Sequence, residues 1–234
     1  MNRFVLIVAV LLLFGANCFA IDFMGPPTAG LKQGQWNIGA IYSFSETDLE
    51  ISDADYTLKD VEINRYWANL GYGFADCWEA NLRLGAANAE IDDFGGEDFS
   101  GGTDFAWGFN TKVTFASAEK IDWGALFQMS WIDTEDTIEG VDLEIDGYEM
   151  QIAAGPTLKM EGWKLYGGPF LHFVDADIEV EILDLTGSAD LEEDSEFGGY
   201  VGTQIDLTEN TALNIEGQVT GGGWGIGAGI GWRF

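Results

Sequence analysis

The sequence is poor in cysteine, histidine and positive charge, and each scarcity narrows what the protein can be. Its 234 residues include two cysteines, Cys18 and Cys77, and a single histidine. Only 10 basic residues stand against 40 acidic ones, for a formal charge of −30, which argues against nucleic acid as a partner. Such a charge is also typical of disordered chains, but hydrophobic residues at 47% and aromatic residues at 14% are too abundant for disorder.

Long apolar runs are scarce as well, and the one near the start predicts export. An apolar run follows Arg3 directly and gives way to small residues that end at Ala20. This pattern predicts a secretory signal peptide over residues 1–20. The run is shorter than the roughly 20 residues that a transmembrane helix needs. Cleavage after Ala20 would leave Cys77 as the last cysteine, so no internal disulfide is expected.

What the rest of the chain has in abundance is alternation of apolar and polar residues, the period of a β-strand. In the last segment, for example, Trp224 to Phe234 hold the apolar positions and glycines hold most of the positions between them. The template predicts ten strands, at residues 35–50, 60–74, 78–92, 103–115, 121–135, 142–160, 163–181, 197–207, 211–220 and 223–234. Connections after even-numbered strands are short, whereas those after odd-numbered strands are long, except in the last hairpin.

The acidic residues gather in the long connections. Residues 45–60, 90–104, 133–146 and 175–196 hold most of the 40 acidic residues and one base, Lys59. The negative charge is therefore expected at one end of the sheet. The acidic runs offer oxygen ligands for Ca²⁺ or Mg²⁺, but none has EF-hand spacing and acidic surface loops are usually only solvated, so we expect no cofactor.

The distribution of aromatic residues distinguishes a membrane barrel from a soluble antiparallel sandwich, which alternation alone would also fit. Tryptophans stand near both ends of the apolar face, as they do at the two interfaces of a bilayer. The predicted aromatic belts contain Trp36, Trp78, Trp123, Trp163 and Trp232 at the short-turn end, and Trp107, Trp131 and Trp224 at the other end. A sandwich core has no reason to sort its aromatic residues in this way.

A reversal of polarity within single strands supports the same conclusion. Odd-numbered positions are apolar from residue 163 to Phe173, and the same parity then carries Asp175 and Asp177. A strand whose outer face changes from apolar to charged has passed from lipid to water. Pro156 and Pro169 each remove a backbone donor from this region, so a bulge or local irregularity is expected there.

These observations predict an all-β fold, a closed antiparallel transmembrane β-barrel of ten strands, with eight possible, short periplasmic turns and long acidic extracellular loops. The terminal aromatic residue, Phe234, is similar to the C-terminal assembly signal of bacterial outer-membrane barrels. Together with the signal peptide and the strand plan, it makes the chain resemble small outer-membrane β-barrels of the OmpA, OmpX and OmpW type (porin-like). The expected organisation is a signal peptide (1–20), an N-terminal periplasmic arm (21–33) and the barrel (34–234).

The resemblance implies the bacterial cell outer membrane as location, with outer-membrane lipid, lipopolysaccharide and the barrel-assembly machinery as partners, and a monomer. By parity, a set of charged residues points into the lumen: Arg65, Arg83, Lys112, Lys159, Lys164, Arg233, Glu79, Asp122, Glu149, Asp206 and Glu216. This set either satisfies buried polar groups or forms the gate of a small pore. Apolar residues are expected to close the outer mouth: Leu49, Ile51, Val61, Ile63, Leu143, Ile145, Ile178 and Val180.

Catalysis is the rival hypothesis, because some small barrels modify lipid A with a histidine paired to a serine or carboxylate. The single histidine, His172, faces inward with no serine at nearby alternate positions. We therefore expect no catalytic, cofactor-binding or metal site. The predicted function is that of a surface protein of the outer membrane, with a structural, surface-interaction or minor permeation role and an occluded lumen. A small gated pore for ions or small solutes is the alternative, and a lipid A-modifying enzyme is a third.

Overall fold

The alternating segments form one large β-sheet. The computed structural model describes residues 21–51, 56–94, 97–138, 141–182, 185–192 and 196–234. The strands are β1 (Trp36–Ile51), β2 (Tyr56–Ala75), β3 (Trp78–Phe94), β4 (Glu97–Ser100), β5 (Asp104–Ser117), β6 (Ile121–Ile138), β7 (Val141–Met160), β8 (Trp163–Ile182), β9 (Leu185–Glu192), β10 (Glu196–Asp206), β11 (Thr211–Val219) and β12 (Gly223–Arg233). In these ranges, no helix has the length and apolar composition to cross a membrane.

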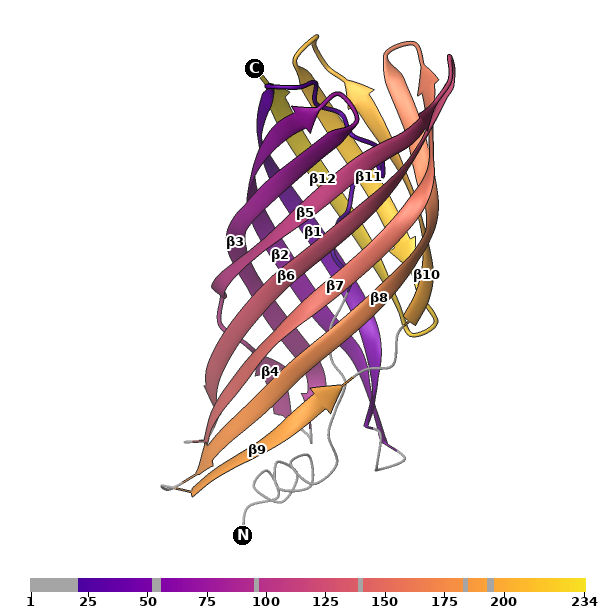
Figure 1. Cartoon of the computed structure of the whole chain (residues 1–234). Coiled ribbons are helices and arrows are strands. Elements are labelled where there is room, and N and C mark those ends of the chain that lie inside the picture. The colour runs from indigo at the N-terminus through magenta and orange to yellow at the C-terminus, as the bar shows by residue number, and fades with distance from the viewer. Residues whose placement is uncertain (1–20, 52–55, 95–96, 139–140, 183–184, 193–195) are drawn as a thin grey trace.

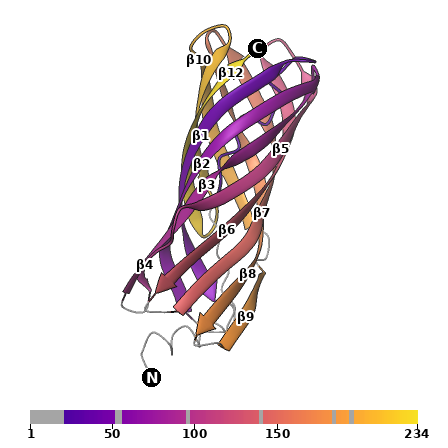
Figure 2. The same ribbon diagram turned by 90° about the vertical axis from the view of Figure 1, so that its left-hand side faces the viewer.

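Ten of these strands close into a tall antiparallel barrel (Figures 1 and 2). Each pairs with its neighbour in the chain, β3 pairs with β5, β8 pairs with β10, and β12 pairs with β1 to complete the circle. Closure gives every wall strand two partners, so the wall has no open edge. The predicted closed barrel and its ten strands are confirmed, and the count of eight is wrong.

The strands extend further than predicted at the end with the long connections. β6 and β7 stay paired up to Ile138 and Val141, and β8 continues to Ile182, where it turns into β9. β9 and the short β4, which pairs with β3, were not predicted as strands. Much of the acidic sequence is thus an extension of the barrel wall rather than irregular loop. The C-terminus lies at the opposite end, with the short turns (Figure 1).

Side chains alternate between the lumen and the outer surface. In β12, Gly225, Gly227 and Gly229 are buried, whereas Trp224 and Ile230 are exposed. The same alternation holds in the other wall strands, so the outer face is apolar and the lumen is lined by polar residues. This is the inside-out arrangement that a lipid environment stabilises.

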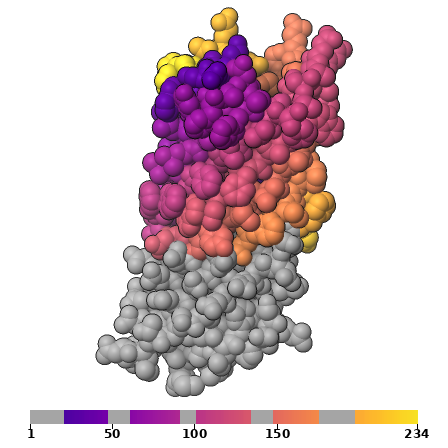
Figure 3. Space-filling model, in the orientation of Figure 1, coloured from indigo at the N-terminus to yellow at the C-terminus, as the bar shows by residue number. Residues whose placement is uncertain are grey.

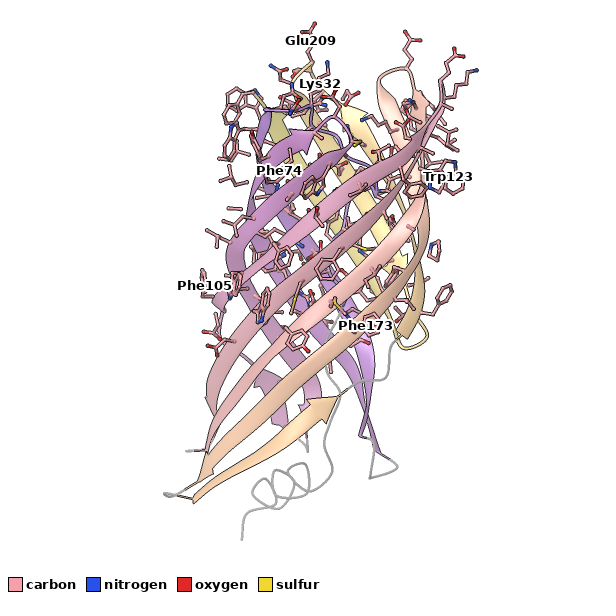
Figure 4. The ribbon with its side chains drawn as sticks, in the orientation of Figure 1. Lys32, Phe74, Phe105, Trp123, Phe173 and Glu209 are labelled. Atoms are coloured by element: carbon pink, nitrogen blue, oxygen red, sulfur yellow. The ribbon has the colours of Figure 1, made fainter. Side chains whose placement is uncertain are left out.

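Aromatic side chains form two levels on the outer face. Figure 4 shows Phe74 and Trp123 near the short-turn end, and Phe105 and Phe173 at a second level further along the barrel. Exposed members of the predicted belts are Trp36, Trp78, Trp123, Trp163, Trp232, Trp107 and Trp224, and the ring of Trp131 stacks on Trp107 at 4.1 Å. In the space-filling view, the described side chains of this face form a continuous wall (Figure 3).

The predicted irregularity at the two prolines is confirmed. β7 and β8 pair at Ala153 with Phe170 and again at Thr157 with Tyr166, while the positions between them are not paired with each other. Pro156 and Pro169 lie in this gap and keep their partners on the other neighbouring strands, β6 and β10. The register is the same on both sides, so the sheet accommodates the missing donors by a local break rather than by a shift.

Candidate functional site in the barrel lumen

The N-terminal arm, residues 21–35, precedes β1, and its residues 21–31 occupy the lumen. Ile21, Phe23, Met24 and Leu31 are 6% exposed or less, and Asp22 is completely buried. The arm contains no regular strand, so its backbone donors need other acceptors, and wall side chains supply several of them. Residues 21–33 were expected to form a periplasmic arm, whereas the structure places residues 21–31 inside the barrel.

Asp22 anchors the beginning of the arm to the wall. Its carboxylate forms an ion pair of 2.9 Å with Arg83 and accepts hydrogen bonds from Ser43 Oγ at 2.8 Å and Trp67 Nε1 at 3.3 Å. The Arg83 guanidinium also lies 4.6 Å from the centre of the Trp67 ring, in a cation–π contact. Asp22 and Arg83 are both completely buried, so each neutralises a charge that would otherwise be costly in the lumen.

Two further carboxylates hold the backbone of the arm. Glu216 on β11 accepts hydrogen bonds from the backbone N–H groups of Met24 at 2.9 Å and Gly25 at 3.0 Å. Glu79 on β3 does the same for Gly30 at 2.7 Å and Leu31 at 2.9 Å. Hydrogen bonds to an ionised acceptor are stronger than neutral ones. The arm is therefore held at three carboxylates, including its own Asp22.

Close packing explains the glycines of β12 that face inward. A Cβ atom at Gly227 would lie 2.6 Å from Cδ2 of Phe23, closer than van der Waals contact permits. Glycine at this position leaves room for the phenylalanine ring, because the wall has no side chain where the ring of Phe23 packs against it. The same demand for space does not arise on the outer face, where β12 carries its large residues.

A second charged cluster lies deeper in the lumen. Arg65 forms an ion pair of 3.0 Å with Glu149 and donates to Ser45 Oγ at 3.1 Å. Ser130 Oγ donates to the other oxygen of Glu149 at 2.8 Å, and Nε2 of His172 lies 3.8 Å from the carboxylate. The serine thus bonds to the carboxylate and not to the histidine, which is the wrong order for a hydrolytic triad. All of these groups are also shielded from solvent.

A chain of wall amides links the Asp22 carboxylate to Glu216. Gln128 donates to Gln151 at 2.9 Å, Gln151 donates to Gln218 at 3.3 Å, and Gln218 donates to Glu216 at 2.7 Å. Gln218 also donates to the backbone carbonyl of Asp22 at 2.8 Å. The wall and the arm therefore share one continuous polar network. Removing one side chain from it leaves the neighbouring buried groups without a hydrogen-bond partner.

The structure divides the predicted lumen residues into two groups. Arg65, Arg83, Lys112, Glu79, Glu149 and Glu216 are buried around the arm. The other five lie towards the short-turn end and reach solvent in part: Lys159, Lys164, Arg233, Asp122 and Asp206. In this second group, Lys159 and Asp122 form an ion pair of 2.9 Å, and Arg233 donates to the backbone carbonyl of Glu209 at 3.3 Å.

Sequence reasoning missed the arm residues and the hydroxyls that bind the charged groups. Asp22, Ser43, Ser45 and Ser130 all take part in the network, but short polar side chains at inward positions carry no signal of their own. Two features of the sequence could have indicated the arm: the glycines of β12 that face inward, and the inward carboxylates Glu79 and Glu216. Both indicated space and acceptors for a segment that the strand pattern did not include.

Two predicted features lie mainly outside the residues whose side chains are described. Among the apolar residues expected at the outer mouth, Val61 and Ile63 are buried in the lumen. The remaining six lie outside the residues whose side chains the structure describes: Leu49, Ile51, Leu143, Ile145, Ile178 and Val180. The side chains of most acidic residues in the long connections also lie outside the described set. In the described part of the chain, no group of three or more potential ligands gathers as for a metal ion.

Comparison with known proteins supports the fold only. No family model and no curated protein sequence matches the chain. Among solved structures, the translocator domain of the autotransporter NalP from Neisseria meningitidis matches with a TM-score of 0.54 and 10% identity, covering 88% of this chain and 90% of that one. The beta domain of the Bordetella autotransporter BrkA gives 0.53 and 12%, covering 85% and 99%. The outer membrane protein OprG from Pseudomonas aeruginosa gives 0.46 and 12%, covering 88% and 98%. The resemblance that the sequence suggested is thus confirmed at the level of architecture: the protein has the fold of bacterial outer-membrane β-barrels.

Proposed function

We propose that the protein is an integral outer-membrane barrel with a structural or surface-interaction role, whose lumen is closed by its own N-terminal arm. The observation that carries this proposal is the burial of Asp22 and its neighbours in the middle of the lumen, where an open porin would hold water. The arm contributes backbone, a charge and the Phe23 ring to the space that a solute would have to cross.

The outer surface supports the membrane part of the proposal. It is apolar over the height between the two aromatic levels, and barrel closure gives every wall strand a partner on both sides. A water-soluble protein would expose this surface at a large cost in free energy, whereas acyl chains would cover it. The monomer, the signal-peptide export and contact with lipopolysaccharide at the acidic end belong to the same proposal.

Single-channel recording in planar bilayers tests the closed lumen. The purified wild-type barrel is expected to insert without a steady current, whereas a variant lacking residues 21–31 is expected to conduct. Insertion must be verified independently, for example by the resistance of the folded barrel to SDS without heating. A steady wild-type current of the same size as that of the variant would contradict the proposal.

A small gated pore is the second candidate, and one observation favours it. Described contacts between arm and wall are non-covalent hydrogen bonds, ion pairs and packing, so the arm can leave without breaking the barrel. In that case the wild-type recording would show brief openings whose conductance equals that of the variant without the arm. The lumen does not favour catalysis, because the Ser130 hydroxyl donates its proton to Glu149 rather than to an imidazole that could act as a base.

A further inference from the structure

The lumen contains a cavity of about 120 Å³ between the arm and the wall, near the short-turn end. Its floor is formed by the arm at Phe23, Met24 and Gly25. Its rim includes Lys164 and Arg233, which stand next to the ends of β8 and β12 and are partly exposed. The cavity therefore opens towards the end of the barrel that carries the short turns.

The charge of the cavity is opposite to that of the protein. Its lining contains three cations, Lys112, Lys164 and Arg233, and one carboxylate, Glu79. That carboxylate already accepts two backbone hydrogen bonds from the arm, at 2.7 and 2.9 Å. In a chain of net charge −30, this lining is a local surplus of positive charge, and such a surplus attracts anions at short range.

Two of the cations have unused donors. The ammonium groups of Lys112 and Lys164 form no hydrogen bond or ion pair with any residue that the structure describes, although Lys112 is only 9% exposed. The Nζ atom of Lys112 lies against the arm, 3.1 Å from the position that a Cβ atom at Gly25 would take. The carboxylates of Glu79 and Glu216 attract the Lys112 ammonium from a distance, but a buried ammonium without a hydrogen-bond acceptor is costly. A ligand with anionic oxygens would provide the missing acceptors.

The other polar groups of the lining suit the same ligand. Carboxamide side chains surround the cations, contributed by Asn37, Asn69, Asn81, Asn110, Gln204 and Asn214. Amide N–H groups can donate to anionic oxygens, and amide carbonyls can accept from a hydroxyl of the ligand. We propose that this cavity is a binding site for a small soluble oxyanion of the size of phosphate, entering from the short-turn end and held between Lys112 and Lys164.

Lipid phosphate is the competing source of the same chemistry. The cavity lies inside the wall, where the acyl chains of a lipid would have to share the lumen with the arm. A free anion meets no such obstacle, so inorganic phosphate is the appropriate probe and phosphatidic acid in mixed micelles is the comparison.

Isothermal titration calorimetry of the full-length mature protein in a non-ionic detergent tests the site. Inorganic phosphate is expected to bind saturably with one site per barrel, and Lys112→Gln and Lys164→Gln are each expected to weaken binding by about tenfold or more, because each removes a charged hydrogen-bond donor. Lys159→Gln is the matched control, since Lys159 lies at the same end but is paired with Asp122 and does not line the cavity. It should bind phosphate as the wild type does.

Three results would overturn the proposal. One is the absence of saturable phosphate binding, and another is an equal loss of affinity in the Lys159→Gln control, which would indicate a general effect of charge. The third is binding of phosphatidic acid without binding of inorganic phosphate. If Lys112→Gln fails to fold because of its buried position, Lys164→Gln at the rim still decides the outcome.

Discussion

Replacing Glu216 with alanine is expected to release the N-terminal arm and open the lumen. The carboxylate accepts backbone hydrogen bonds from Met24 and Gly25 at 2.9 and 3.0 Å, and the change leaves both buried donors without an acceptor. A buried donor left without its acceptor costs roughly 1–3 kcal/mol, so the arm loses about 2–6 kcal/mol of its preference for the lumen. The population of barrels with a displaced arm should then rise roughly 30-fold to 20,000-fold.

Two measurements follow this change. Single-channel recordings should show frequent openings of the Glu216→Ala variant, and a cysteine introduced at Thr28 in a Cys77→Ser background should react faster with a maleimide. Thr28 is 7% exposed in the closed state, so its reactivity reports directly on displacement.

The matched control is Glu209→Ala. Glu209 stands at the short-turn end (Figure 4), is exposed and binds Arg233 through its backbone carbonyl only, so its removal changes the net charge equally without touching the arm. The Glu216→Ala variant could instead show no more channel openings and no faster maleimide reaction at position 28 than this control. That result would refute the role of the Glu216 carboxylate in holding the arm.

Three further changes test other parts of the structure. Arg83→Met leaves Asp22 as an unpaired buried charge and should lower the free energy of unfolding in urea by about 3–5 kcal/mol; adding Asp22→Asn should recover most of the loss, and no recovery would argue against the ion pair. Gly227→Val places a side chain where Phe23 lies, with its Cβ atom 2.6 Å from the ring, so it should produce conductance that Phe23→Ala in the same chain reduces. Cys77 is exposed in the turn between β2 and β3, and in a Gram-negative host a membrane-impermeant maleimide should label it only after the outer membrane is permeabilised. Labelling of intact cells would place the short turns outside.

The sequence was sufficient to predict the wall of the barrel. The sequence of each wall strand shows which of its side chains face outward, because outward and inward residues alternate along it, as Trp224 and Gly225 do. The parity that assigned Arg83 and Glu149 to the lumen depends only on strand geometry, and it needed no knowledge of the partners.

The arm and the added strands could not be predicted in the same way. Asp22 binds a wall residue through a contact that no periodicity encodes, and Met24 bonds to a carboxylate 192 positions away. β9 is held by backbone pairing with β8, and its sequence lacks strict alternation. Local patterns determine which face of a strand points to the lumen. Which segment fills the lumen depends instead on long-range contacts that form only in the folded barrel.

The position of Ile21 has a practical consequence for anyone who wishes to attach a reporter to this protein. That residue is 3% exposed and lies within the barrel, so a tag fused directly ahead of it would start inside the lumen. The tag would either have to pass through the lumen or pull the first residues of the arm out of it. Both would change the closed state of the barrel. The turn at Thr208–Asn210, which is exposed at the end of β10, offers a place where an epitope can be inserted without entering the cylinder.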